Sequence, residues 1–386
     1  MSWTSRELRG PLLRAAKAFS AVILTGPRRA GKTALLRRTF PRASYHLLEA
    51  PDIIGRVRAD PRGWLEGITT PAILDEVQNV PELFAYVRAL IDAAPSKRGR
   101  WLLTGSQDFA LMRGVTESMA GRAAILQLLP LSARELGTFN FLRGGFPEVW
   151  ARPSSSSLWF DSYVQTFLER DVRALRAVKD LSTFRRFLSL LASRHGTMLN
   201  RTELAAPLGV SVPTISEWLS VLETTGQIAL LPPYFKNFGK RLVKSPRVFW
   251  LDSGLVCHLL GITTQAQLEA SPFIGAVFEG FLAAEILKGQ VNAGQRRELY
   301  TFRDERGLEI DFVVPGAGGR LRLVAAKWTK TVLPSHALPL TRLDAGPNAE
   351  RLVVYRAARS GARATTVAPG VRAQSVEEFL GISEPN

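Results

Sequence analysis

The residues from Gly26 to Thr33 have the composition and spacing of a phosphate-binding loop. The segment Gly-Pro-Arg-Arg-Ala-Gly-Lys-Thr fits the pattern G-x-x-x-x-G-K-[ST]. Glycines let backbone amides close around phosphate oxygens, and a helix that begins at Gly31 points its positive dipole end toward them. We expect Lys32 to neutralise the β- and γ-phosphates of ATP and Thr33 to ligate Mg²⁺. The full set of predicted nucleotide-binding residues is Gly26, Pro27, Arg28, Arg29, Ala30, Gly31, Lys32, Thr33 and Ala34.

An acidic pair, Asp75 and Glu76, follows the apolar residues Ile73 and Leu74. Asp75 is predicted to organise the Mg²⁺ shell through water, and Glu76 to polarise the attacking water. The alternative is that the pair only caps a helix, because anions favour helix starts. Together with the glycine-rich loop, the pair favours ATP hydrolysis over mere binding.

Three further residues are candidates for contacts with the γ-phosphate. Ser106 closes a short apolar segment, where a polar side chain can sense this phosphate, and Thr104 is the nearby substitute. Arg122 is a candidate arginine finger toward a neighbouring subunit, although it fits an ordinary exposed arginine as well. Arg28, within the loop, is the rival candidate for stabilising the same charge.

Short apolar segments alternate with helical stretches in the first third of the chain. The segments 19–25, 71–76, 100–106 and 123–129 are predicted strands, and the glycine-rich loop stands between the first of them and a run of good helix formers. This alternation is typical of a parallel sheet covered by helices on both faces. The fold class expected for residues 1–137 is therefore an α/β P-loop NTPase.

Composition excludes several classes of protein. The 386 residues include one cysteine, Cys257, which rules out a disulfide framework and a cysteine-based zinc cluster. Four scattered histidines (His46, His195, His258, His336) make a histidine-built metal site improbable. No apolar run is long enough for a membrane span and the first residues are no signal peptide, so we expect a cytoplasmic protein without membrane contact.

The chain has 50 Lys and Arg against 34 Asp and Glu, a formal net charge of +16. Nucleic acid, an acidic protein or an anionic membrane surface would suit this surplus. The basic residues flank predicted turns and strands and do not form one face of a long helix, which argues against the membrane. One part of it lies at the nucleotide region, and another part is concentrated at 170–186 and 240–247, on either side of the segment 202–219. The residues of the first part are Arg28, Arg29, Lys32, Arg37 and Arg38.

The motifs together resemble the AAA-type ATPases that carry a C-terminal domain of unknown function, DUF4143. The resemblance covers essentially the whole chain, and it rests on residues 26–33, 74–78, 103–106, 122–135, 144–147 and 169–172. It implies an AAA+ ATPase core that uses ATP and Mg²⁺, then a winged helix, then a restriction-endonuclease-like α/β domain.

Residues 202–219 have the pattern of a helix-turn-helix, with Gly209 at the turn. Residues at the start of its second helix would contact base edges: Ser211, Pro213, Thr214 and Ser216. The basic segment 234–247 is predicted to form a wing that contacts phosphates. DNA contact is favoured, and docking onto a protein is the alternative.

The C-terminal part resembles the nuclease fold at Glu279, Asp311 and Lys327, but Ala325 stands where a second strand carboxylate is expected. A divalent ion needs several hard oxygen ligands, so this loss predicts a domain without nuclease activity, retained for binding or docking.

The sequence thus predicts an ATPase core over 1–137, a helical linker over 138–195, a winged helix over 196–260 and a nuclease-like domain over 261–386. Hydrolysis would be coupled to binding or remodelling of DNA. The alternative is a nucleotide-dependent switch that docks a protein through its C-terminal domain, as in a toxin–antitoxin or defence system. A homo-oligomer is expected in either case.

Overall fold

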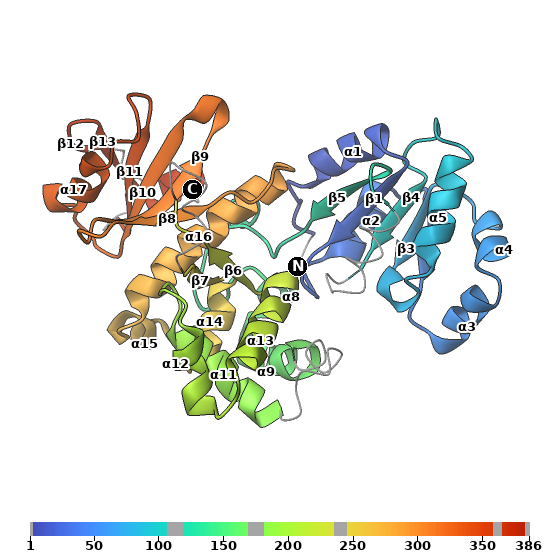
Figure 1. The fold of residues 1–386 in the computed structure, drawn as a ribbon, viewed down its shortest axis with the longest axis horizontal. Helices are drawn as coiled ribbons and strands as arrows, with labels where there is room; N and C mark the ends of the chain where they lie inside the picture. The colour runs from blue at the N-terminus through green and yellow to red at the C-terminus, as the bar shows by residue number, and fades with distance from the viewer. Residues whose placement is uncertain (1–2, 106–118, 169–180, 235–244, 358–364, 383–386) are drawn as a thin grey trace.

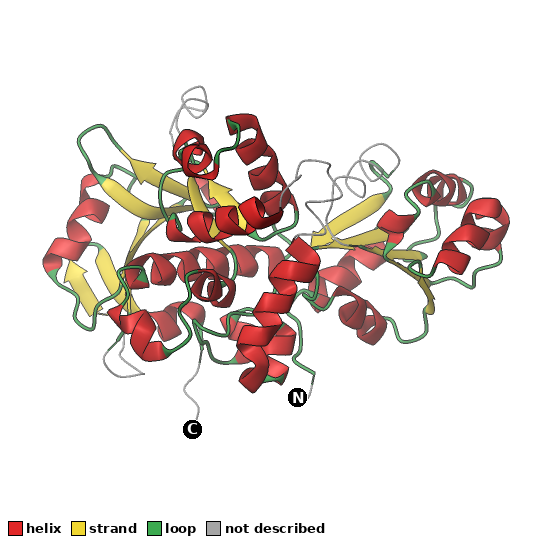
Figure 2. Cartoon of the chain, turned by 90° about the horizontal axis from the view of Figure 1, so that it is seen from below, coloured by secondary structure: helices red, strands yellow, loops and turns green. Residues whose placement is uncertain are grey.

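The computed structural model describes residues 3–105, 119–168, 181–234, 245–357 and 365–382. A sheet stands at each end of the molecule, and helices fill the space between the two sheets (Figures 1 and 2). The first sheet belongs to the N-terminal third of the chain and the second to the C-terminal third.

The N-terminal sheet has five parallel strands in the order β2-β3-β4-β1-β5. Its strands are β1 (Ala21–Thr25), β2 (Ser44–Leu47), β3 (Ala72–Asp75), β4 (Trp101–Thr104) and β5 (Ala123–Gln127). Its helices are α1 (Arg9–Ala18), α2 (Lys32–Thr39), α3 (Pro51–Ala59), α4 (Pro61–Glu66) and α5 (Leu83–Asp92).

Side chains of the central strands alternate between two cores, as the period of a strand requires. Val22 and Leu102 pack with Leu36 of α2, whereas Ile23 and Leu103 face the cluster on the α5 side. Both faces of the sheet are therefore covered by helices, which explains why β1, β3 and β4 are buried throughout. The predicted P-loop NTPase-like fold with a parallel sheet is confirmed.

The central part of the chain is largely helical. It contains α7 (Ala133–Leu136), α8 (Pro147–Ala151), α9 (Ser156–Tyr163), a π-helical turn (Val164–Leu168), α11 (Leu181–Ser193), α12 (Arg201–Ala205), α13 (Val212–Thr224), β6 (Ile228–Leu231), β7 (Arg247–Trp250), α14 (Ser253–Leu259) and α15 (Gln265–Ala270). The turn between α12 and α13 contains Gly209, whose φ of +65° lies in the left-handed region. Strands β6 and β7 form an antiparallel pair directly after α13.

A long helix, α16 (Ile274–Asn292), leads into the C-terminal sheet. This sheet has six strands in the order β12-β13-β11-β10-β9-β8. Its elements are β8 (Tyr300–Arg303), β9 (Glu309–Pro315), β10 (Leu321–Lys327), α17 (Pro334–Arg342), β11 (Glu350–Tyr355), β12 (Thr365–Ala368), β13 (Val371–Ser375) and α18 (Val376–Leu380).

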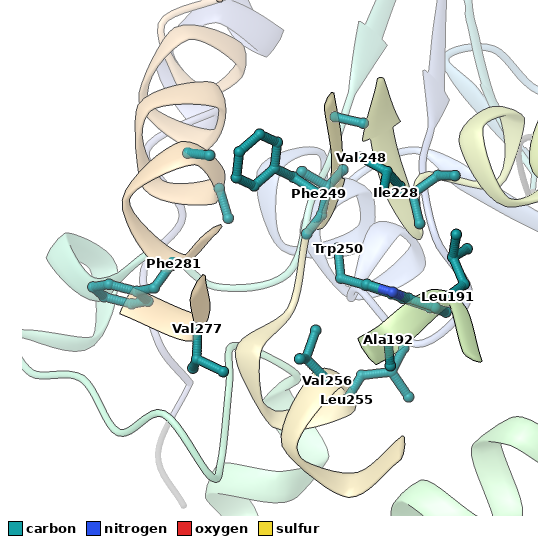
Figure 3. Close-up of a cluster of buried hydrophobic side chains, with 14 of the residues drawn as sticks. Leu191, Ala192, Ile228, Val248, Phe249, Trp250, Leu255, Val256, Val277 and Phe281 are labelled. Carbon is teal, nitrogen blue, oxygen red and sulfur yellow. The ribbon is translucent and has the colours of Figure 1, made fainter. Parts of the chain in front are cut away.

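One hydrophobic core runs from the central helices into the C-terminal part. Trp250 and Phe249 of the β6–β7 pair lie between Leu191 of α11 and Val277 of α16 (Figure 3). The same cluster reaches Phe312 of β9, so the central helices hold the C-terminal sheet in place. The domain bounds at 195 and 260 stay predictions.

No helix in the described ranges combines the length and the apolar character needed to cross a membrane.

Candidate active site

The glycine-rich loop joins β1 to α2 and depends on two glycines with positive φ. Gly26 has φ +139°, and a Cβ atom there would lie 2.1 Å from the carbonyl oxygen of Leu128. Gly31, with φ +96°, precedes the first residue of α2. Only glycine fits both positions, so the loop closes tightly against Leu128, directly after β5, and leads into the start of α2, where backbone N–H groups can bind an anion.

Lys32 is the first residue of α2, and its buried side chain turns back into this loop. Its ammonium group donates hydrogen bonds to the carbonyl oxygens of Gly26 and Pro27, each at 2.9 Å. The charge is thus held inside the loop, in the place where phosphate oxygens would take over as acceptors.

Three donors converge on the carboxylate of Asp75 at the carboxyl end of β3. The hydroxyls of Thr33 and Tyr45 both donate to Oδ2 at 2.8 Å, and the backbone N–H of Glu76 donates to Oδ1 at 3.1 Å. Burial raises the pKa of Asp75, and the donors from Thr33 and Tyr45 oppose that effect. The adjoining hydroxyl and carboxylate oxygens of Thr33 and Asp75 fit Mg²⁺, which takes hard oxygen ligands.

Glu76 adopts a left-handed backbone conformation, with φ +58°. Its carboxylate accepts a hydrogen bond from the side chain of Gln78 and lies 4.0 Å from Nη1 of Arg28. The predicted base and the rival arginine of the loop are therefore close together.

Thr104 ends β4, the strand between β1 and β3, and pairs in register with Asp75. Its hydroxyl is fully buried and has no hydrogen-bond partner within the described part of the chain. Ser106 lies outside the described residues, so Thr104 is the polar side chain that the structure places beside the site. A role as phosphate sensor stays a prediction for both.

Arg122 lies at the amino end of β5, whereas the nucleotide loop lies at the carboxyl ends of the strands. It precedes Ala123, which pairs with Ala21 at the start of β1, whereas the loop follows the last pair of that ladder, Thr25 and Gln127. Its guanidinium donates to Asp92 at 2.6 and 3.0 Å. The structure does not bring Arg122 to the nucleotide site of its own chain, and its role toward a neighbouring subunit stays a prediction.

Arg6 belongs to the site although sequence reasoning missed it. Its guanidinium donates to the carbonyl oxygens of Ala30 (2.8 Å) and Leu129 (2.6 Å) and to the carboxylate of Glu135 (3.0 Å). Both charged side chains are almost completely buried, at 2% and 0% exposure. Nothing in the neighbouring sequence distinguishes Arg6 from the other arginines, because its partners are 24 to 129 residues away in the chain. Tyr45 was missed for the same reason.

The central helices contact the loop directly. Arg29 pairs with Glu148 of α8 at 3.0 Å, and the same carboxylate accepts from the indole of Trp159 at 2.6 Å. Pro27 lies against Gly226, just beyond the end of α13. The nucleotide loop is thus in contact with the helices that follow the sheet.

A second charged cluster lies between β7 and the C-terminal sheet. Arg247 is 2.6 Å from the carboxylate of Glu279 on α16 and 3.4 Å from that of Glu309 on β9. Asp311 of β9 accepts from the ammonium of Lys327 at 3.4 Å. Burial and the neighbouring Asp311 raise the pKa of Glu279 to about 8. The three predicted residues Glu279, Asp311 and Lys327 are thus brought together.

Ala325 of β10 is buried in the sheet beside this cluster. Within the described ranges, no group of three or more His, Cys, Asp or Glu side chains is placed to hold a metal ion.

Three family models match the chain in succession: an AAA domain over residues 18–137, a domain of unknown function (DUF8612) over 138–266 and another (DUF4143) over 274–370. Uncharacterized protein Rv2008c of Mycobacterium tuberculosis is 35% identical over 320 residues, which cover 81% of this chain and 71% of that protein. The chain belongs to the AAA-domain ATPase family with a C-terminal DUF4143 domain. Uncharacterized protein Mb2031c of Mycobacterium bovis matches this member to the same extent.

Solved structures resemble this AAA-domain ATPase more distantly. The Walker-type ATPase PABY2304 of Pyrococcus abyssi is 15% identical and covers 66% of this chain and 94% of its own, with a TM-score of 0.44. The RuvB Holliday junction branch migration motor of Thermotoga maritima is 18% identical and covers 58% and 89%, with a TM-score of 0.33.

Proposed function

We propose that this P-loop ATPase hydrolyses Mg²⁺–ATP and couples hydrolysis to binding or remodelling of DNA through the helix-turn-helix formed by α12 and α13. One observation carries the proposal: the chain just beyond the carboxyl end of α13 lies against Pro27 of the nucleotide loop. A change in the loop therefore has a direct path to a predicted DNA-contacting element.

The residues of the site divide the hydrolytic work. Lys32 and the loop amides bind the phosphates. Thr33 and Asp75 would hold Mg²⁺, which neutralises the negative charge that develops on the phosphate oxygens during hydrolysis. Glu76 orients and polarises the attacking water once its carboxylate leaves Gln78 and Arg28. The released guanidinium of Arg28 then lies within the loop, ready to meet phosphate charge.

Helix α13 is suited to connect the two functions. It has 13 residues and is therefore about 20 Å long. Its carboxyl end adjoins the nucleotide loop, whereas Ser211 caps the other end, where the half-buried Thr214 and Ser216 are among the proposed base-contacting side chains.

The β6–β7 pair is proposed to be the wing of a winged helix. Its basic connection, 235–244, lies outside the described residues, and Arg247 at the start of β7 is committed to Glu279 and Glu309. We therefore assign the proposed phosphate contacts to residues 235–244, between β6 and β7, and not to Arg247.

The C-terminal sheet with α16 is proposed to be a restriction-endonuclease-like domain without nuclease activity. The guanidinium of Arg247 lies among the carboxylates that would otherwise bind a cation, and Ala325 supplies no ligand. This domain would serve binding. We also propose a cytoplasmic homo-oligomer, in which Arg122 reaches a neighbouring nucleotide.

The test is ATP turnover with and without single-stranded, duplex and branched DNA across a salt series. We expect DNA to stimulate turnover, and its binding to weaken steeply with salt. Lys32→Ala should abolish turnover, and Glu76→Gln should retain nucleotide binding but lose hydrolysis. Turnover that DNA leaves unchanged would refute the coupling and leave the ATPase assignment intact.

The second candidate is a nucleotide-dependent switch that docks a protein. The start of α13 favours it in one respect, because Ser211, Val212 and Thr214 carry no charge and Val212 is 38% exposed. Capture of a protein partner that depends on Lys32, without any effect of DNA on turnover, would select this function.

A further inference from the structure

A cleft of about 1120 Å³ separates the ATPase core from the C-terminal sheet. Its lining residues come from α1, from β9, β10 and β13, and from the last turns of α16. In the ribbon, α16 runs between α1 and the C-terminal sheet (Figure 1). None of the predicted nucleotide-binding or base-contacting residues lines it, so it is separate from both sites described above.

Basic side chains dominate the charge of this cleft. Five arginines line it: Arg14, Arg134, Arg320, Arg322 and Arg372. Two exposed or half-exposed carboxylates oppose them. Glu7 pairs with Arg134 at 3.1 Å, and Glu350 is shared by Arg322 (2.6 Å) and Arg372 (2.7 Å).

The third carboxylate of the lining, Glu285, is buried and paired with Lys288 at 2.8 Å. Arg14 and Arg320 form no ion pair within the described part of the chain. The cleft therefore presents a surplus of positive charge to whatever enters it, and an anionic occupant would meet two guanidinium groups without a carboxylate partner.

The size of the cleft limits the shape of the occupant. Its volume exceeds the roughly 300–1,000 Å³ of pockets for small molecules, which favours an extended ligand. A volume of this size accommodates a few nucleotides of an extended single strand, and it is too small to enclose a duplex, whose major groove alone is about 12 Å wide.

The remaining lining indicates how a strand would be held. Gln295 and Asn348 present exposed amides, which donate to phosphate oxygens. Phe379 is the one aromatic side chain among the lining residues in the described ranges, so stacking of successive bases is not supported. Contacts would go to the backbone and would be independent of base sequence.

We propose that this cleft binds the sugar–phosphate backbone of single-stranded nucleic acid. The proposal rests on the proposed DNA-coupled function and adds a second contact, distinct from the helix-turn-helix. The cleft is also connected to the ATPase core. Lys288, the partner of the lining residue Glu285, donates to the carbonyl oxygen of Leu131, and the backbone N–H of Ala133 donates to Glu285.

The experiment measures binding of a labelled oligothymidylate and of a duplex of equal length by fluorescence anisotropy, across a salt series, on the full chain. The variant is Arg14→Ala/Arg320→Ala. The matched control is Lys17→Ala/Arg306→Ala, which removes two exposed charges from the same two parts of the chain outside the cleft.

We expect the cleft variant to weaken oligothymidylate binding and to lower the slope of log K against log salt by about 1.4, since each single-strand phosphate contact contributes roughly 0.7. The control should match the wild type. Thermal unfolding of both variants checks that the fold is intact.

Four outcomes would overturn the proposal. Equal effects of cleft variant and control would remove the cleft as the site while leaving the proposed function in place. An equal loss of duplex binding, or displacement of the oligothymidylate by poly-glutamate at matched charge, would assign a different occupant. A wild-type chain that binds no DNA at all would refute this inference together with the DNA coupling, whereas ATP turnover would still test the ATPase.

Discussion

Gly226 lies against Pro27 of the nucleotide-binding loop. A Cβ atom on Gly226 would be 3.1 Å from Cγ and 3.2 Å from Cδ of the proline ring, closer than side chains ordinarily pack. Gly226 also has φ +73°, which only glycine adopts at little cost. The turn after α13 is therefore shaped to accept the nucleotide loop, and the two move together or lose the contact.

Gly226→Ala should weaken ATP binding and lower the free energy of unfolding. The left-handed backbone costs about 1–2 kcal/mol for a residue with a Cβ atom, and the methyl group displaces Pro27. We expect the KM for ATP to rise roughly fivefold, the lower end of coupling free energies between sites. Gly261→Ala is the control, because Gly261 has φ +71° but no atom within 4 Å of its Cβ position. Equal KM values in the two variants would show that the contact between Gly226 and Pro27 does not affect ATP binding.

Tyr45→Phe should raise the Mg²⁺ concentration needed for half-maximal ATP turnover. It removes one of the two hydroxyl donors that fix Oδ2 of Asp75. A hydrogen bond to a charged group contributes about 1.5–3 kcal/mol, so a shift of roughly tenfold, at the low end of that range, is expected for Tyr45, which is 36% exposed. Tyr86→Phe on α5 is the matched control. An unchanged Mg²⁺ titration would assign Tyr45 a packing role only.

Arg6→Ala should be among the most destabilising single changes in the N-terminal part. It leaves the buried carboxylate of Glu135 without its guanidinium, and breaking a buried pair costs about 3–5 kcal/mol. Chemical denaturation measures this loss, with exposed Arg9→Ala as the neutral control. The double variant Arg6→Ala/Glu135→Gln should recover part of the loss, because the unpaired charge is gone. Strict additivity of the two single changes would contradict a coupled pair.

Glu279 should make stability depend on pH. Burial and Asp311 raise its pKa from 4.5 to about 8 in the folded chain, and their effect exceeds that of the adjacent Arg247, which lowers it. Between these two values the folded state binds more protons than the unfolded state, so stability falls as pH rises from about 4.5 to about 8. The slope for one group is at most about 1.4 kcal/mol per pH unit.

Glu279→Gln should flatten this part of the profile, as measured by the Tm from pH 5 to pH 8.5, while Glu305→Gln, at an exposed turn, should follow the wild type. A profile identical in Glu279→Gln and the wild type would mean that Glu279 is ionised throughout.

Local pattern was enough to predict the ATPase core. The spacing from Gly26 to Thr33 and the position of Asp75 after a short apolar strand fix a strand, a loop and a helix within consecutive residues, because phosphate binding needs glycine and a helix start at those places. The structure places Thr33 and Asp75, the two predicted Mg²⁺-binding residues, in hydrogen-bond contact. The helix-turn-helix pattern likewise gave the two helices on either side of Gly209.

Tertiary structure alone decided what surrounds the loop. Arg6, Tyr45 and Gly226 approach it from distant parts of the chain, and no spacing in the sequence links them to Gly26 or Asp75. Arg122 lies at the amino end of β5, away from the nucleotide loop, because β5 runs parallel to β1. A short motif does not specify this direction. Residues that act through the local backbone leave a pattern in the sequence, whereas residues brought together by packing of separate elements acquire their roles only when the chain folds.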